Sequence, residues 1–423
     1  MIETETRTSK EAGAGLYAWA IVALLWVVAL LNYLDRQIIF SVFPLLKADL
    51  RPSDLQLGLL GTVFLWVYGL VSPVSGFLAD RFGRVRIIIV SLLVWSSVTW
   101  LTRYVRDFND LVALRALMGL SEACYIPAAL ALIAEYHARG RLSLATGIHT
   151  SGIYTGIVLG GWGGGELGER YGWRFAFAAL GVIGVVYTLL LLPSLRERST
   201  PSREDQPRFL PALRELLSIP GFKTLIFVFA SFSLTNWAIY TWLPSYLYER
   251  FDMKLAAAGF SATFYIQVAS FVGILFGGWL ADKWNRVSAR GRVLTQLIGV
   301  ALAAPCLFLV GFTASTTPLI AALILFGLGR GFYDCNTMPV LSQIARSDLR
   351  STGYGVFNMV GTLTGGVIAA AAGALKNIIG LGGVFQIAAP LLLISAVMLS
   401  RLRIESRAKL EGSLVPPENP IPR

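Results

Sequence analysis

Long apolar stretches separated by short polar segments dominate the chain. A helix needs about 20 apolar residues to cross a bilayer, and by this criterion the pattern predicts twelve membrane-spanning segments. They cover residues 17–43, 54–78, 86–105, 109–136, 143–166, 173–193, 222–248, 255–281, 293–312, 317–340, 352–375 and 381–400. The longest internal polar interval separates the sixth segment from the seventh. The pattern therefore predicts an all-α integral membrane protein with six helices in each half.

The same pattern sets the expected domain boundaries. We expect an N-terminal tail over residues 1–15, a six-helix bundle over 16–193, a linker over 194–220, a second six-helix bundle over 221–402 and a C-terminal tail over 403–423. The first apolar segment is too long for the core of a signal peptide and contains charges, so we expect no cleavable leader.

Composition and charge exclude several classes of protein. Of the 423 residues, 55% are hydrophobic and 14% are charged, whereas soluble domains have roughly 25% charged residues. The net charge of +11 lies mostly in short loops between apolar segments, so we expect no nucleic-acid partner. Three cysteines and two histidines do not provide a disulfide framework or a metal cluster, and no ATP-type phosphate loop is present. We expect no metal, no cofactor and no enzymatic activity.

The distribution of Lys and Arg predicts the orientation. If both termini are cytoplasmic, 24 of the 36 basic residues fall in the tails and inner loops and 9 in the outer loops, while Arg36, Arg115 and Arg330 fall within segments. Cytoplasmic loops are enriched in basic residues. We therefore expect a multi-pass protein of a bacterial inner (plasma) membrane with both termini in the cytoplasm.

The two halves also repeat each other. Gly76-Phe-Leu-Ala-Asp80-Arg-Phe-Gly-Arg84 follows the second segment, and Gly278-Trp-Leu-Ala-Asp282-Lys-Trp-Asn-Arg286 follows the eighth, 202 residues later. In the fourth and tenth segments an acid lies three residues after a glycine and a proline lies eight after it, as Gly119, Glu122 and Pro127 and as Gly331, Asp334 and Pro339. Parallel repeats of this kind are typical of transporters whose binding site lies between the halves, near the membrane midplane.

The loop over residues 76–84 resembles the most specific signature of the major facilitator superfamily. Asn32-Tyr-Leu-Asp-Arg-Gln37 and Arg115-Ala-Leu-Met-Gly-Leu-Ser-Glu-Ala123 resemble two branches of it, the spinster-like lipid transporters and the anion:cation symporters. The resemblance covers nearly the whole chain and implies two six-helix bundles around a central cavity. It also implies that Asp35 and Glu122 take part in proton coupling.

Charged residues inside the first and fourth segments are candidates for the chemistry of transport. Such residues are costly in lipid and mark cavities or proton relays. Asp35 and Arg115 fall at comparable depth, which allows an ion pair between them, and Glu122 lies two turns deeper than Arg115. We interpret Asp35 and Glu122 as proton-binding groups. Arg36 and Arg115 would then be cations for which these two carboxylates and an anionic substrate compete. The alternative is a static network that joins the two helices.

The tenth segment carries the densest polar patch of the second half. Arg330 and Asp334 are four residues apart, so they share a helix face and can pair. Tyr333 and Asn336 flank them, and this combination suits a substrate rich in hydroxyl groups. A gating ion pair without substrate contact is the other interpretation.

Further polar residues complete the set of candidates. His149 is either a third proton-binding group or a hydrogen-bonded structural residue. The other candidate cavity-lining residues are Asn32, Tyr154, Asn236, Tyr240, Gln267 and Asn358. The glycine-rich run over residues 160–165 predicts close helix contact rather than a nucleotide loop.

The two repeated loops have a different predicted role. The resemblance implies a conformational latch on the outward-facing state, formed by Gly76, Asp80, Arg81, Arg84, Gly278, Asp282 and Arg286. We expect both first glycines to permit close approach of a neighbouring helix, and the arginines of the first loop to pair with Asp80.

These observations predict a secondary active transporter that works by alternating access. We expect proton coupling, with sodium left open as the coupling ion, and a small organic anion or sugar derivative as substrate. The alternative within the same fold is a spinster-like lipid or lysolipid transporter. A receptor or scaffold without transport is disfavoured, because such a protein would not need the intramembrane charges. We expect a monomer whose partners are the bilayer, the substrate and the coupling ion.

Overall fold

A computed structural model describes residues 2–137, 139–197, 209–219, 221–346 and 349–402. Within these ranges the chain is helical. The N-terminal bundle contains α1 (Ile2–Ser41), α2 (Phe43–Leu50), α3 (Asp54–Phe82), α4 (Arg84–Leu101), the 3-10 turn η1 (Thr102–Tyr104), α5 (Phe108–Glu122), α6 (Tyr125–Tyr136), α7 (Arg139–Tyr171) and α8 (Trp173–Ser194). The short helix α9 (Phe209–Ser218) precedes the C-terminal bundle, which contains α10 (Phe222–Phe251), α11 (Leu255–Asn285), α12 (Gly291–Phe312), α13 (Thr316–Ile344) and α14 (Arg350–Arg401).

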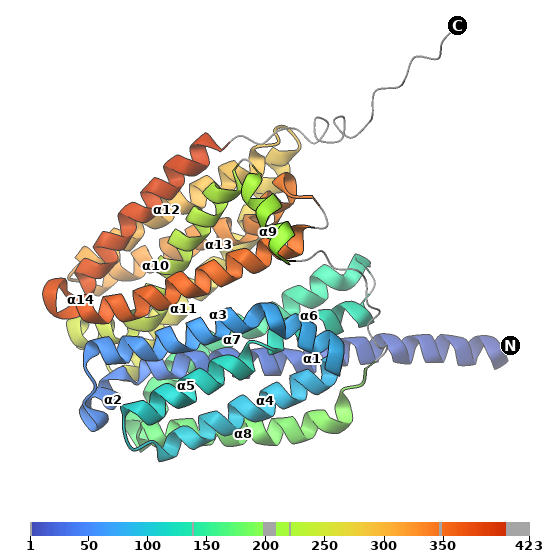
Figure 1. The fold of residues 1–423 in the computed structure, drawn as a ribbon, viewed down its shortest axis with the longest axis horizontal. Coiled ribbons are helices and arrows are strands. Elements are labelled where there is room, and N and C mark those ends of the chain that lie inside the picture. The colour runs from blue at the N-terminus through green and yellow to red at the C-terminus, as the bar shows by residue number, and fades with distance from the viewer. Residues whose placement is uncertain (1, 138, 198–208, 220, 347–348, 403–423) are drawn as a thin grey trace, which may run out of the picture.

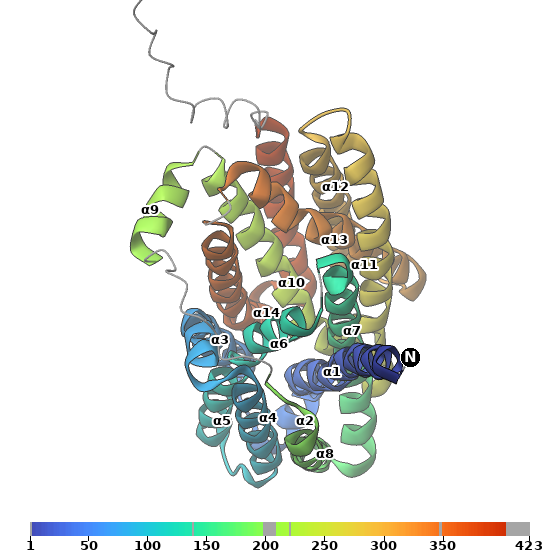
Figure 2. The same cartoon turned by 90° about the vertical axis from the view of Figure 1, so that its right-hand side faces the viewer.

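The two bundles lie side by side (Figures 1 and 2). Helix α3 packs along α14, and α7 packs along α11, so these two pairs form most of the contact between the bundles. Helix α2 lies at one end of the molecule, which we call the α2 end, and α9 and the N-terminus lie at the other, which we call the α9 end (Figure 1).

Ten helical stretches of the described chain are long and apolar enough to cross a membrane. One of them, Thr352–Arg401, is 50 residues long and includes both of the last two predicted segments. Gly380 interrupts it with a φ of 71°, a conformation that favours glycine. Glycine-rich α7, the fifth predicted segment, is not among the ten. The ten stretches therefore differ from the twelve predicted segments in two respects: the last two segments form one helical stretch, and α7 is not counted.

The fourth predicted segment is one 29-residue span, Phe108–Tyr136, whose helix is interrupted by a turn at Ala123 and Cys124. Helix α5 ends at Glu122 and α6 begins at Tyr125, so the acid lies in the last turn before the break. Pro127 provides the physical reason, because it has no N–H to donate to the carbonyl of Ala123. The side chain of Glu122 in this last turn of α5 is fully buried.

The hydrogen bonds between the bundles, within the described ranges, lie between the α2 end and the middle of α3. Gln37 donates to the carbonyl of Tyr240 at 3.2 Å, and Thr62 donates to the carbonyl of Gly366 at 2.7 Å. At the extreme α2 end, Lys376 of α14 forms an ion pair with Asp54 of α3 at 3.2 Å. The bundles are therefore tied together on the α2 side of the molecule.

The remaining boundaries differ in detail from the sequence prediction. The predicted N-terminal tail is helical from Ile2, as part of α1. The predicted linker contains α9, and its residues 198–208 and 220 lie outside the described chain, as do residues 403–423 of the predicted C-terminal tail.

Candidate substrate cavity and its charged residues

A cavity of about 470 Å³ lies between the two bundles. Helices α1 and α7 line it from the N-terminal bundle, and α10, α11, α13 and α14 line it from the C-terminal bundle. Its lining residues include two guanidinium groups, of Arg36 and Arg330, and one carboxylate, of Asp334. The charge on the lining is therefore positive when all three groups are ionised.

Arg36 is held by a buried ion pair and by aromatic rings. Its Nε donates to Oε2 of Glu122 at 2.5 Å. The guanidinium carbon lies 4.6 Å from the ring centre of Tyr33 and 4.5 Å from that of Tyr68, which places the cation within cation–π range of both rings. The ion pair joins α1 to α5 and orients Arg36 beside the cavity.

Asp35 and Arg115 do not form the ion pair that their depths allowed. Asp35 contacts the hydroxyl of Thr99 through Oδ2 at 3.3 Å, and its Oδ1 has no hydrogen-bond partner in the described chain. Arg115 donates to the carbonyl of Leu60 at 3.3 Å and lies over the ring of Phe64. Adjacent residues of a helix point about 100° apart, so equal depth did not bring the two side chains to one face. The pair that forms is Arg36–Glu122.

The polar patch of α13 forms a second charged network. Arg330 donates through Nε to Asp334 at 3.1 Å and through Nη1 to the hydroxyl of Tyr240 and to Oε1 of Gln267. Gln267 also donates to the Tyr240 hydroxyl at 2.8 Å. The network links α13, α10 and α11, and within it Arg330, Asp334 and Tyr240 line the cavity.

Six of the twelve residues predicted to bind substrate or to line the cavity do line it. They are Arg36, Tyr154, Asn236, Tyr240, Arg330 and Asp334. The other six are not among its lining residues: Asn32, Arg115, Gln267, Tyr333, Asn336 and Asn358. Tyr333 is buried and stacks on Phe232 with ring centres 4.2 Å apart, and the amide of Asn336 donates to the carbonyl of Phe332. Asn32 is fully buried near Glu122.

Sequence reasoning also missed several polar lining residues. They are Tyr33, Gln37, Thr150, Ser233, Thr337 and Tyr354. Tyr33 and Gln37 flank Arg36 in the motif of the first segment and could have been found by that position. The other four are ordinary hydroxyl residues of apolar helices, and nothing in their spacing marks them.

His149 lies outside the cavity lining. Its Nε2 is 2.9 Å from the hydroxyl of Tyr125, which donates to the carbonyl of Leu25 at 2.7 Å. Because that hydroxyl hydrogen is already used, His149 is the donor to the tyrosine oxygen. This geometry agrees with the structural interpretation of His149, as a tie between α7, α6 and α1.

The predicted pairing of the first loop's arginines with Asp80 stays a prediction, because it falls outside the described side chains. The surroundings of Gly76 and the side chain of Asp80 lie outside the described part of the structure. Arg84 pairs with Glu135 of α6, and its backbone N–H donates to Glu197 at 2.5 Å. A Cβ on Gly278 would meet nothing within 4 Å, so close helix approach is not its role.

The remaining residues of these loops lie at the surface. Asp282 pairs with Arg292 at 3.3 Å. Arg81 and Arg286 are exposed.

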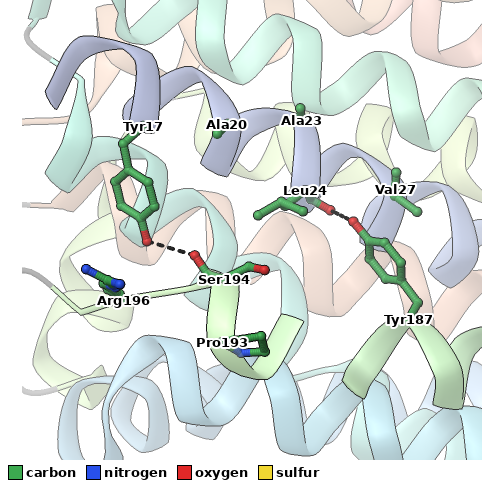
Figure 3. Close-up of a pocket in the computed structure, with 9 residues that line it drawn as sticks. All are labelled: Tyr17, Ala20, Ala23, Leu24, Val27, Tyr187, Pro193, Ser194 and Arg196. Atoms are coloured by element: carbon green, nitrogen blue, oxygen red, sulfur yellow. Dashed lines mark hydrogen bonds between the residues drawn. The ribbon is translucent and has the colours of Figure 1, made fainter. Parts of the chain in front are cut away.

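A second cavity lies on the outside of the N-terminal bundle, between α1 and α8 (Figure 3). It encloses about 740 Å³ and is lined mostly by apolar residues such as Leu24 and Val27. The hydroxyls of Tyr17 and Tyr187 both donate to backbone carbonyls, of Ser194 and Leu24 (Figure 3). Its tyrosine hydroxyls are therefore already engaged, and it shares no lining residue with the central cavity.

Comparison with known proteins identifies the family. A sequence model of the Major Facilitator Superfamily matches residues 25–370, which include both walls of the central cavity. The chain belongs to the Major Facilitator Superfamily. This assignment confirms the resemblance drawn from the motifs.

Within the Major Facilitator Superfamily, similar proteins come from two groups. The probable galactarate/D-glucarate transporter GarP of Escherichia coli is 25% identical over 82% of this chain and 85% of its own length. Protein spinster homolog 1 of Xenopus laevis is 26% identical over 82% of this chain and 70% of its own length. The D-galactonate transporter of Escherichia coli is 25% identical over 84% of this chain and 88% of its own.

Solved structures of other superfamily members share the fold. A bacterial homologue of the lysosomal transporter spinster, in an inward-facing and occupied conformation, superposes with a TM-score of 0.79. The match covers 92% of this chain and 99% of that one at 20% identity. The nucleoside transporter NupG gives a TM-score of 0.75 at 11% identity.

Proposed function

We propose that this protein is a proton-coupled secondary transporter that carries a small hydroxylated organic acid by alternating access. The observation that carries the proposal is the central cavity, whose lining has two arginines against one acid. Cations partly removed from water attract an anion strongly, because the surrounding dielectric is low. A carrier of this kind would be a transporter and not an enzyme, and we expect it to act as a monomer.

The polar lining favours a sugar acid as the substrate. Hydroxyl and amide groups surround the two arginines, from Tyr33, Gln37, Tyr154, Asn236 and Tyr240. Such groups both donate and accept hydrogen bonds, as the hydroxyls of a sugar do. The named substrates of similar proteins, galactarate, D-glucarate and D-galactonate, belong to this class.

The Arg36–Glu122 pair supports a direct coupling between proton and substrate. Glu122 holds the guanidinium of Arg36, which also lines the cavity. A proton on Glu122 would remove its charge and release Arg36 for the carboxylate of the substrate. Asp35, whose Oδ1 has no partner in the described chain, offers a second buried carboxylate within electrostatic range of Glu122. Intramembrane acids of this kind commonly form proton relays.

We further propose twelve membrane crossings with both termini in the cytoplasm of a bacterial cell. In this arrangement α7 crosses once and α14 crosses twice, with its bend at Gly380 outside. The excess of basic residues in the tails and in the loops of the α9 end supports a cytoplasmic α9 end. The ties at the α2 end would then make this an inward-facing state.

Lipid or lysolipid transport is the second candidate function. The similarity to spinster homologues supports it, together with an apolar part of the cavity wall formed by Ile153, Ile157, Phe229 and Trp237. The two arginines and the surrounding hydroxyls favour the sugar acid.

Transport into proteoliposomes tests the proposal. We expect the purified protein to accumulate radiolabelled galactarate or galactonate when the outside is more acidic than the lumen. Asp35→Asn mimics the protonated acid, so it should abolish this accumulation while exchange of labelled for unlabelled substrate continues. Glu215→Gln removes a partly exposed carboxylate of α9, outside the cavity and the predicted latch, and serves as the control.

Two results would contradict the proposal. Accumulation by Asp35→Asn at the wild-type rate would exclude the coupling role of Asp35. Transport of a lysolipid with no transport of either sugar acid would favour the second candidate function.

A further inference from the structure

We propose that the cavity recognises a substrate with two acidic groups, one bound by Arg36 of the N-terminal bundle and the other by Arg330 of the C-terminal bundle. The inference rests on the proposed function and narrows its substrate class to diacids, of which the six-carbon sugar diacid galactarate is an example. It is carried by the placement of one guanidinium group on each bundle's wall of a single cavity.

The guanidinium group of Arg330 is held in position, but not all of its hydrogen-bond donors are used. Its Nε and Nη1 donate to Asp334, Tyr240 and Gln267. Its Nη2 has no hydrogen-bond partner among the described residues, although the residue lines the cavity. A planar guanidinium that neighbours hold in place loses little freedom when it binds a carboxylate. Arg330 is therefore preorganised for an acidic group.

Arg36 has the corresponding arrangement in the other bundle. Its Nε is occupied by Glu122, and the rings of Tyr33 and Tyr68 hold its head group. Neither Nη1 nor Nη2 has a hydrogen-bond partner in the described chain, and Nη2 is buried. Buried donors that lack partners are costly, so a carboxylate that accepts from Arg36 would gain free energy from this site as well.

A diacid fits this pair better than a monoacid does. A monoacid satisfies one arginine and leaves the cationic site of the opposite bundle unfilled. A diacid engages both bundles at once, so it favours a conformation in which both walls close on it. The competing interpretation is that Arg330 and Asp334 only stabilise the C-terminal bundle and do not touch the substrate.

Binding of three matched ligands separates these interpretations. Galactarate has two carboxylates, galactonate has one and galactitol has none, on the same carbon chain. We expect calorimetry with the purified full-length protein to show galactarate bound at least tenfold more tightly than galactonate, and galactitol bound most weakly. Arg330→Gln should weaken galactarate about tenfold or more while galactonate changes less than about threefold, where tenfold corresponds to about 1.4 kcal/mol. Arg292→Gln, which breaks an ion pair of the same bundle outside the cavity, should change neither.

A second variant allows the inference to be tested even if Arg330→Gln does not fold. Asp334→Asn retains the guanidinium but removes its anionic partner, so it should tighten galactarate more than galactonate. Equal effects of Arg330→Gln on both acids, or an unchanged ratio of affinities in Asp334→Asn, would overturn the inference. A wild-type preference for galactonate would overturn it as well. Binding of neither acid to the wild-type protein would overturn the proposed function itself.

Discussion

The buried pair of Arg36 and Glu122 has a structural role in addition to the coupling role proposed for it. The two residues join α1 to α5 at 2.5 Å, and both side chains are almost completely shielded from solvent. Removing one partner of such a pair leaves an uncompensated buried charge and costs about 3–5 kcal/mol, whereas apolar replacement of both partners is often neutral. Loss of transport in a single variant would therefore not show by itself that the residue binds a substrate or a proton.

A double substitution separates the two roles. We expect Arg36→Met and Glu122→Leu each to lower the free energy of unfolding by about 3–5 kcal/mol. Each single variant should therefore unfold at a lower temperature than the wild type in detergent. The combined variant should unfold near the wild-type temperature and still fail to transport, because it has neither the cation nor the acid. Thermal unfolding measured beside uptake checks this. A combined variant that transports normally would show that the pair is only structural.

At the scale of the helix, α7 presents glycines to two different partners. Gly152, Gly156 and Gly160 contact the backbone of α1, where an added Cβ would lie 2.3–2.7 Å from carbonyl oxygens. Gly161 faces α11 of the other bundle, and a Cβ there would lie 2.6 Å from the carbonyl of Gly259. Small residues at such positions let helices approach closely in a membrane. The first face holds the N-terminal bundle together, and the second closes the bundles onto each other.

Gly161→Val tests the second face alone. The added side chain cannot fit against α11, so we expect it to open the α2 end and to reduce the transport rate while the N-terminal bundle stays folded. A cysteine that replaces Ser233, which lines the cavity, should then react faster with a thiol-specific reagent supplied from the α2 side. Gly163→Val is the matched control on the same helix, because a Cβ there meets nothing within 4 Å. Equal labelling of the two variants would contradict this role of the contact.

Across the whole molecule, an ion cluster at the α2 end connects the bundles. Asp54 of α3 accepts from Lys47 of its own bundle at 2.7 Å and from Lys376 of the opposite bundle at 3.2 Å. Lys376 also pairs with Glu249 of α10 at 2.7 Å. In a two-state carrier, a contact made in one state stabilises that state by its own interaction free energy. In the proposed alternating-access cycle, the cluster would therefore favour closure of the α2 end.

The two lysines of this cluster allow a controlled comparison. Lys376→Gln removes the tie between the bundles, so we expect increased labelling of the Ser233 cysteine from the α2 side and little change in unfolding temperature. Lys47→Gln removes a charge from the same aspartate but lies within one bundle, so labelling should stay near the wild-type level. Similar labelling in both variants would show that the cluster does not control closure.

The sequence alone determined the features that depend on local composition and spacing. Segment length and hydropathy predicted a membrane protein, and the motifs around Asp35 and Gly76 predicted the superfamily. Within the site, the intramembrane charges identified Arg36, Arg330 and Asp334 as cavity residues, because a charge in lipid requires a polar environment.

Tertiary structure decided which groups meet. Depth along a helix can be counted from the sequence, but the direction of a side chain depends on how each helix is rotated in its bundle. For this reason Arg36 and not Arg115 reaches Glu122, and Tyr333 turns into the core although its neighbour Asp334 lines the cavity. The interruption after Glu122 and the bend at Gly380 were also seen only in the structure, because hydropathy counts apolar residues and does not report backbone conformation.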